Sequence, residues 1–243
     1  MSISKTRAIV LHHLKYGDSS IIVDMYTEEF GRMSFMVNGV MSKKSTIKVG
    51  LFQSLTILEL DVYLKAGRDL QRIREIRAAL PLNELRMNLL KSTIGLFIAE
   101  ILYKVLRESE KDASLFHFIS RSIEFLDGQQ LGVSNFHVLF LLNLSRFLGF
   151  YPNSDDVDLS SYFDLVEGRF VSKIPVHRHY LAGESLLVFK SMLDHSMSEL
   201  ESLSLSSEER AHLLDALVLY YQIHIPGMSS VKSLSVLQEV FNG

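Results

Sequence analysis

Three stretches of the chain carry side chains whose types and spacing could do chemistry. The first, NGVMSKKSTIKVG at 38–50, places Lys43, Lys44 and Lys48 close together with no carboxylate between them. Ammonium groups at this spacing suit contact with phosphate. A solvated turn between two strand-like segments explains the same residues, and charge alone leaves both interpretations open.

The other two stretches hold metal-binding residue types but lack a complete ligand set. His177 and His179 in PVHRHY would share one face of a strand, yet no neighbouring cluster of Asp, Glu or His completes a coordination sphere. The segment at 153–161, NSDDVDLSS, is dense in aspartate, but Asp158 stands where a calcium loop counted from Asn153 requires glycine. We therefore expect surface histidines, a solvated acidic loop and neither metal nor other cofactor.

Signatures of catalysis are missing from the sequence. It contains no G-x-x-x-x-G-K-[ST] loop, G-x-G-x-x-G turn, H-E-x-x-H helix or G-x-S-x-G elbow. The chain also has no cysteine, which excludes disulfides, thiolate metal sites and cysteine nucleophiles. We expect a protein that is not an enzyme.

Charge divides the chain into a basic and an acidic part. The whole carries a formal net charge of −3, but residues 1–80 hold 12 Lys and Arg against 8 Asp and Glu. Residues 81–243 hold 13 against 20. The basic part is interpreted either as a nucleic-acid surface or as a solvated face.

Hydrophobic patterning changes at the same place. The first 80 residues read as four or five short strands, including AIVLHHLKY, SSIIVDMYT and FQSLTILELDVYL, which predicts a small β-barrel. From Pro81 onward, apolar residues recur every three or four positions, as helices require. We expect an α+β protein with a barrel at 1–80, an α-helical domain at 81–243 and a β-hairpin insertion near 162–172.

The chain shows neither a signal peptide nor a membrane span. Its N-terminal apolar run, Ala8 to Leu11, is too short for a signal core. The most apolar later stretch, at 92–106, contains Glu100 and Lys104. We expect a cytoplasmic protein without a membrane segment.

The order of several motifs resembles that of the RecO family of bacterial recombination mediators. AIVLHHLKYGDSSIIVDMYTEEFGRMSFMVNGVMSKKS contains T-E-x-x-G-R and G-x-x-S-K-x-S in the family's order. The segments LFQSLTILEL, LPLN, FLLNLSRFLGFYPN, FDLVEGRFVS and VKSLSVLQEVF follow it nearly to the end of the chain.

The resemblance implies an OB-fold head and a helical body. It implies binding of single- and double-stranded DNA without sequence specificity, annealing of complementary strands and, with RecR, loading of RecA onto DNA coated by single-stranded DNA-binding protein (SSB). The DNA contacts expected are basic residues of the head: Arg7, Arg32, Lys43, Lys44, Lys48, Arg68 and Arg72.

The resemblance also implies docking of the acidic, Phe-ended tail of SSB on the helical body. Our candidates for that contact are Phe136, Phe140, Arg121 and Arg146. Some relatives carry a four-cysteine zinc site, which a chain without cysteine cannot form. The alternative is a non-enzymatic adaptor whose helical domain recruits SSB or RecR, with DNA contact secondary.

Overall fold

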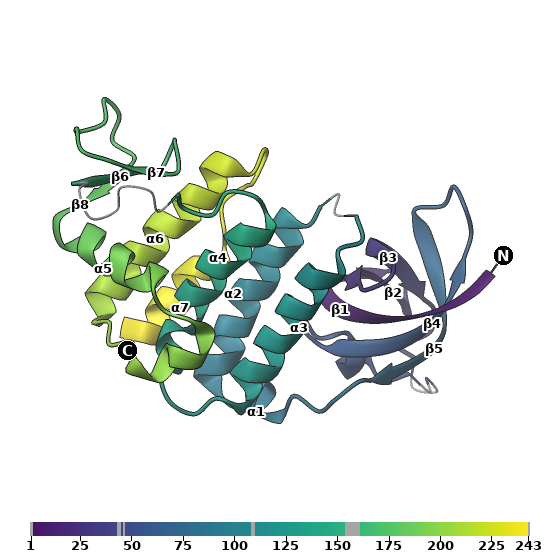
Figure 1. Cartoon of the computed structure of the whole chain (residues 1–243). Helices are drawn as coiled ribbons and strands as arrows, with labels where there is room; N and C mark the ends of the chain where they lie inside the picture. Colours follow the sequence, from purple (N-terminus) through teal and green to yellow (C-terminus); the bar gives the residue numbers. More distant parts are fainter. Residues whose placement is uncertain (1, 43–44, 46, 108–109, 154–160, 243) are drawn as a thin grey trace. The chain divides into compact units, whose positions relative to one another are not determined.

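The computed structural model describes residues 2–42, 45, 47–107, 110–153 and 161–242 (Figure 1). The chain divides into two compact units, Met1–Gly128 and Gln129–Gly243. The domain boundary expected near residue 80 separates strands from helices, whereas the compact division groups the first three helices with the strands. Among the described residues, no helix combines the length and apolar content that crossing a bilayer requires.

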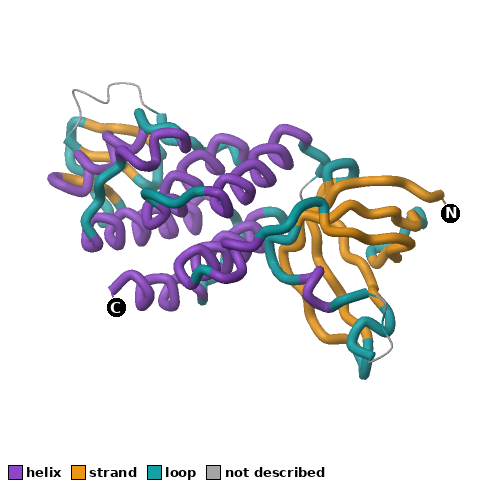
Figure 2. Tube along the Cα trace, turned by 90° about the horizontal axis from the view of Figure 1, so that it is seen from below, coloured by secondary structure: helices purple, strands orange, loops and turns teal. Residues whose placement is uncertain are grey.

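The first unit begins with five strands that close into a barrel of order β1-β2-β3-β5-β4 (Figures 1 and 2). The strands are β1 (Ser2–Tyr16), β2 (Ser20–Thr27), β3 (Gly31–Val37), β4 (Ile57–Leu64) and β5 (Leu70–Ala78). β3 and β5 pair in parallel and all other neighbours are antiparallel. A short 3-10 helix, η1 (Val49–Phe52), interrupts the connection from β3 to β4.

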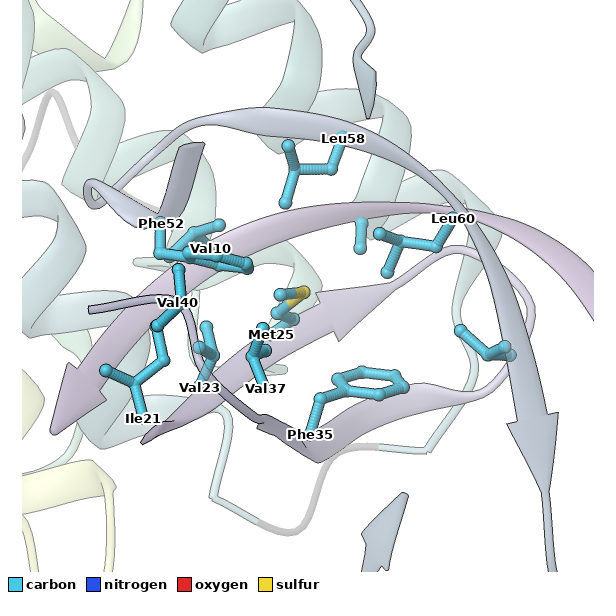
Figure 3. Packing of buried hydrophobic residues seen from close by; sticks show 12 residues of the cluster. Val10, Ile21, Val23, Met25, Phe35, Val37, Val40, Phe52, Leu58 and Leu60 are labelled. Atoms are coloured by element: carbon cyan, nitrogen blue, oxygen red, sulfur yellow. The ribbon is translucent and has the colours of Figure 1, made fainter. Parts of the chain in front are cut away.

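The barrel interior is filled by alternate residues of the strands. Val23 and Met25 of β2 and Leu58 and Leu60 of β4 point inward, as do the other labelled side chains in Figure 3. Phe35 is fully buried and packs in the same cluster. This period-two burial is the pattern of a strand with one face on a core. The expected α+β fold, an OB-type barrel followed by helices, is confirmed.

Barrel closure depends on β1, which is long enough to pair with two neighbours. Its first half, Ser2 to Ile9, pairs with β4, and its second half, Ala8 to Tyr16, pairs with β2. A β-bulge between Val10 and His12 bends the strand from one partner to the next. Each of the five described barrel strands therefore has a hydrogen-bonded neighbour on both sides.

Three helices complete the first unit: α1 (Asn83–Met87), α2 (Leu89–Val105) and α3 (Ala113–Gly128). α2 contacts the barrel through Tyr103, whose ring lies 4.5 Å from the Arg32 guanidinium. Arg32 Nη1 donates to the Tyr103 carbonyl at 2.7 Å and Nη2 lies 3.6 Å from Asp24. The contacts of Arg32 with Asp24 and Tyr103 therefore link α2 to β2 and β3. The side chains of Arg32 and Asp24 are each only 13% exposed, so water weakens this charged pair little.

A second arginine fastens α3 to the barrel. Arg7 of β1 donates to both carboxylate oxygens of Glu28, at 2.8 and 2.9 Å, and lies over the Phe116 ring of α3. The hydrogen bond from Arg7 lowers the pKa of the Glu28 carboxyl. His117 lies 3.2 Å from Arg7 Nη2. Two arginines of the barrel thus hold the helices of the first unit.

The second unit combines helices with a small sheet. Its helical elements are η2 (Val133–Asn135), α4 (Phe136–Phe147), α5 (Gly183–Leu193), η4 (Met197–Ser202), α6 (Ser207–His224) and α7 (Ser233–Asn242). The sheet has the order β7-β6-β8, with β6 (Tyr162–Asp164), β7 (Arg169–Val171) and β8 (Tyr180–Ala182). β6 and β7 form a hairpin through Gly168, which has φ +68°, and β8 adds a third strand.

A buried histidine lies in the core of the second unit. His137 of α4 is fully buried, and its ring stacks on Phe241 of α7 at 5.3 Å. The Arg210 guanidinium lies over the same Phe241 ring and donates to Asn135. Burial, together with the positive charge of Arg210, lowers the pKa of His137 to about 3.

The arginine that fastens α2 predicts a stability effect in the first unit. Arg32→Ala leaves Asp24 without its cation and the Tyr103 carbonyl without its donor, which should cost about 2 kcal/mol. Urea unfolding followed by circular dichroism measures the loss. Arg72→Ala, at an exposed position of the same barrel, is the control and should change stability by less than about 0.5 kcal/mol. Equal stability of the two variants would contradict the fastening role.

The buried histidine predicts acid sensitivity of the second unit. The unfolded chain binds a proton at His137 below about pH 6.5 and the folded chain does not, so stability falls by up to about 1.4 kcal/mol per pH unit from pH 6.5 toward 3. His137→Leu should remove this loss, so that its stability relative to wild type rises by about 2 kcal/mol between pH 6.5 and 5. His212→Leu, at an exposed position, is the control. A parallel pH profile for His137→Leu and wild type would overturn the assignment.

Candidate nucleic-acid interface

The β4–β5 connection is built around one buried glutamine. Gln71 is 6% exposed and its Oε1 accepts from the Lys65 amide at 2.9 Å. Its Nε2 donates to the carbonyls of Lys65, at 3.0 Å, and Arg68, at 2.6 Å. Gly67, with φ +70°, supplies the left-handed residue of the turn. Three bonds to one side chain fix the loop backbone, while Lys65 and Arg68 remain exposed.

A groove of about 490 Å³ opens beside this loop. It is lined by Met36 of β3 and by residues of the loop and of β5, namely Gly67, Arg68, Asp69, Leu70, Gln71 and Arg72. Met36 and Arg72 are direct partners in the parallel β3–β5 pairing, so their side chains share a face of the sheet. Two exposed arginines against one aspartate make the groove a binding place for an anion.

The same face continues toward the β1–β2 turn. Met36 pairs with Ile22 on its other side, and Ile22 lies two residues from the start of β2. The row Ile22, Met36 and Arg72 therefore crosses three neighbouring strands. In barrels of this topology, the face of strands 2 and 3 and the loops joining strands 1–2 and 4–5 bind nucleic acids.

The start of the lysine loop lies against the β1–β2 turn. The Met41 amide donates to the Ser19 carbonyl at 3.0 Å, and Ser20 Oγ donates to Asn38 at 3.4 Å. At the end of β1, Lys15 is exposed and Tyr16 is 51% exposed. An exposed tyrosine beside cations is the pairing that single-strand binders use for base stacking.

Of the three lysines in the β3–β4 loop, the structure describes the position of Lys48. Lys48 is exposed and precedes η1. Lys43 and Lys44 lie outside the described residues, so their positions stay a prediction from sequence. The structure thus places three of the residues expected to contact DNA on the barrel surface: Lys48 in the β3–β4 connection, Arg68 in the β4–β5 connection and Arg72 in β5.

Arg7 and Arg32 have other partners. Arg32 is mostly covered by α2, and Arg7 is held by Glu28 and Phe116. The contacts give both arginines a structural role, which differs from the DNA contact expected of them. Sequence reasoning could not separate them from Arg68 and Arg72, because the residues that engage them come from helices about 70 to 110 positions away.

A second groove of the first unit has the opposite charge. Its volume is about 400 Å³ and its charged lining residues are Lys5, Arg7, Arg77, Glu28, Glu29, Glu59, Asp61 and Glu75. Five carboxylates against three cations repel phosphate. The barrel therefore has one groove suited to a polyanion and one that disfavours it.

The residues expected to bind an SSB tail lie in different settings. Phe136 and Phe140 are 1% and 0% exposed and pack on each other, with ring centroids 6.0 Å apart. They fill the core of the second unit. Arg146 is exposed and lies over the Tyr151 ring at 3.8 Å. Arg121, in the first unit, pairs with Glu124.

Among the described residues, no three side chains of His, Asp or Glu gather as a metal ion requires. His177 and His179 are close, with ring centroids 6.0 Å apart, and His177 Nε2 lies 3.2 Å from Asp164. The feature that sequence reasoning missed is Gln71. A single polar residue at the start of a strand carries no signal that its side chain holds a loop.

Comparison with known proteins finds family patterns over most of the chain. The pattern described as "Recombination protein O N terminal" matches residues 1–81, and "Recombination protein O C terminal" matches residues 86–234. DNA repair protein RecO of Bacteroides fragilis is 39% identical over 241 residues, covering 99% of this chain and 100% of the relative. The RecO proteins of Phocaeicola vulgatus and Flavobacterium psychrophilum are 38% and 36% identical, each over 98% or more of both chains. The chain belongs to the RecO family of DNA repair proteins.

Proposed function

We propose that the protein is a recombination mediator of the cytoplasm that binds single- and double-stranded DNA without sequence specificity. It anneals complementary strands and, with RecR, helps to load RecA onto SSB-coated DNA. The observation that supports the DNA contact is the groove lined by Arg68 and Arg72, beside the loop that Gln71 holds. Barrels of this topology use the corresponding face to bind nucleic acids. No step of this activity needs a catalytic residue.

The chemistry of the surface explains the lack of sequence specificity. Guanidinium groups hold phosphate oxygens through paired, charge-assisted hydrogen bonds, and phosphates are the same in every sequence. Each phosphate that is neutralised releases condensed counterions, which favours binding at low salt. Tyr16 adds a stacking contact that any base satisfies.

Annealing follows from the same charge neutralisation. Two complementary strands repel each other through their phosphates, and arginines and lysines on the barrel lower that repulsion. Base edges are left free, because contact through the backbone does not occupy their pairing atoms. The bound strand is thereby presented for pairing.

A second candidate function is that of an adaptor. Met87, Leu89 and Leu96 of the α1–α2 region are 85%, 71% and 57% exposed, and Leu96 borders a groove of about 320 Å³. Exposed aliphatic side chains beside a groove support docking of a protein partner such as RecR or SSB. A pull-down with an acidic, Phe-terminated peptide, using a variant that cannot bind DNA, separates recruitment from DNA contact.

The basic groove predicts the effect of removing its arginines. Arg68→Ala/Arg72→Ala should weaken binding of mixed-sequence single strands at least about tenfold at low salt. The plot of the logarithm of the association constant against log salt should become less steep by about 1.4. Fluorescence anisotropy across a salt series measures both. Lys5→Ala/Arg77→Ala removes the same charge beside the acidic groove and is the matched control. Equal losses in the two variants would reject the groove.

The buried glutamine predicts a different signature. Gln71→Leu removes the bonds that fix the loop but keeps every cation, so binding should weaken several-fold through added loop disorder. The salt slope should stay that of wild type, because the number of phosphate contacts is unchanged. Unaltered affinity of Gln71→Leu in the same anisotropy assay would show that the loop needs no such support.

A further inference from the structure

The second unit contains one basic segment in an otherwise acidic surrounding. Residues 129–243 hold 7 Lys and Arg against 13 Asp and Glu. Three of those cations, Arg169, Lys173 and Arg178, fall between Gly168 and Gly183, where no carboxylate occurs. The segment also carries His177 and His179. Such a concentration of one charge sign within an acidic unit indicates a partner of opposite charge.

The small sheet gives this segment a buried face and an open face. Phe163, Phe170 and Leu181 are direct neighbours across the three strands and are buried. The alternate positions face the other way. There the Tyr162 and Tyr180 rings meet edge to face, with centroids 5.5 Å apart, and both side chains are partly exposed. The open face therefore offers an aromatic pair.

Two of the described carboxylates next to the segment, Asp164 and Glu167, are held in local bonds. Asp164 accepts from the amides of Val166 and Glu167, at 2.8 and 3.0 Å, and lies 3.2 Å from His177 Nε2. The Glu167 carboxylate accepts from Arg169 Nε at 2.6 Å. Because their charge is offset locally, these two groups repel an incoming anion less than free carboxylates would.

The connection between β7 and β8 is anchored at its centre and open at its sides. His177 is anchored on Asp164, and the Leu165 amide donates to the His179 carbonyl at 3.0 Å. Lys173 and Arg178 are exposed between and beside these anchors. Val176 of the same connection is fully exposed. The backbone is thus held while the cations face solvent.

We propose that this surface, consisting of Lys173, Arg178, Tyr162 and Tyr180, is a second contact for single-stranded DNA, separate from the barrel groove. Cations without carboxylates suit the phosphate backbone, and the tyrosine pair offers ring faces to bases. The inference rests on the proposed function and deepens it. A chain with one contact on each unit holds two strands at once, which raises the local concentration of the second strand during annealing.

The absence of cysteine from the sequence allows a local test on the full-length chain. Val176→Cys, labelled with an environment-sensitive fluorophore, reports on this surface alone. Mixed-sequence single strands should change its fluorescence in the wild-type background and in Arg68→Ala/Arg72→Ala. Adding Lys173→Ala/Arg178→Ala should raise the half-saturating DNA concentration at least about fivefold. Arg107→Ala/Lys232→Ala removes the same charge from exposed positions elsewhere on the chain and should leave it unchanged.

The other outcomes separate the two proposals. A silent label, with normal anisotropy for the whole protein, would overturn the second contact and leave the barrel groove standing. If the wild-type protein binds no DNA at all, both the barrel groove and the second contact are overturned. A response to poly-glutamate of matched charge that equals the response to DNA would show a general anion surface and overturn the assignment to DNA. Annealing that is unaffected by Lys173→Ala/Arg178→Ala would exclude a role in holding the second strand.

Discussion

Closure of the barrel through β1 is the constraint on which the rest of the first unit depends. One bulged strand pairs with β4 along its first half and with β2 along its second, and this fixes where every connecting loop emerges. The β3–β5 parallel pairing, which completes the ring, sets Met36 beside Arg72. The groove at the β4–β5 loop exists because those two strands meet there. A barrel that failed to close would lose the groove together with its core.

Closure also decides which basic residues remain free for a ligand. Arg7 and Arg32 lie on parts of the barrel that α2 and α3 cover, and their charges are used on Glu28, Asp24 and aromatic rings. Arg68 and Arg72, by contrast, are exposed. Positive charge therefore outweighs negative charge at the groove of Arg68 and Arg72, whereas the three cations of the acidic groove face five carboxylates.

Much of the fold could be predicted from local pattern. Strand alternation is one such pattern. Gly31 and Gly168 at left-handed turn positions and the capping box of Ser206 and Glu209 are others. Each of these depends on residues close in sequence, and so the sequence displays it directly. The start of α4 shows the limit. Its cap position is Asn135, and the side chain of this residue donates to the distant Leu203 carbonyl and makes no capping bond.

The candidate site was less predictable than the fold, because its residues are distinguished by contacts with residues distant in the sequence. The excess of basic residues and the order of the motifs indicated the barrel as the DNA-binding part. They predicted a DNA contact for Arg7 and for Arg68 alike. What distinguishes the two is contact with Phe116, which lies more than one hundred residues away. The third strand β8 and the role of Gln71 likewise depend on pairings that only the folded chain reveals.

The central claim is that the protein holds DNA through its phosphates by charge. The most direct measurement is the dissociation constant of the wild-type protein for two unrelated single strands of equal length across a salt series. The account predicts the same constant for both sequences at each salt concentration. The logarithm of the association constant, the inverse of the measured constant, should decline linearly with log salt with a slope of about −1.4 or steeper. A slope near zero, or a constant that differs strongly between the two sequences, would contradict it.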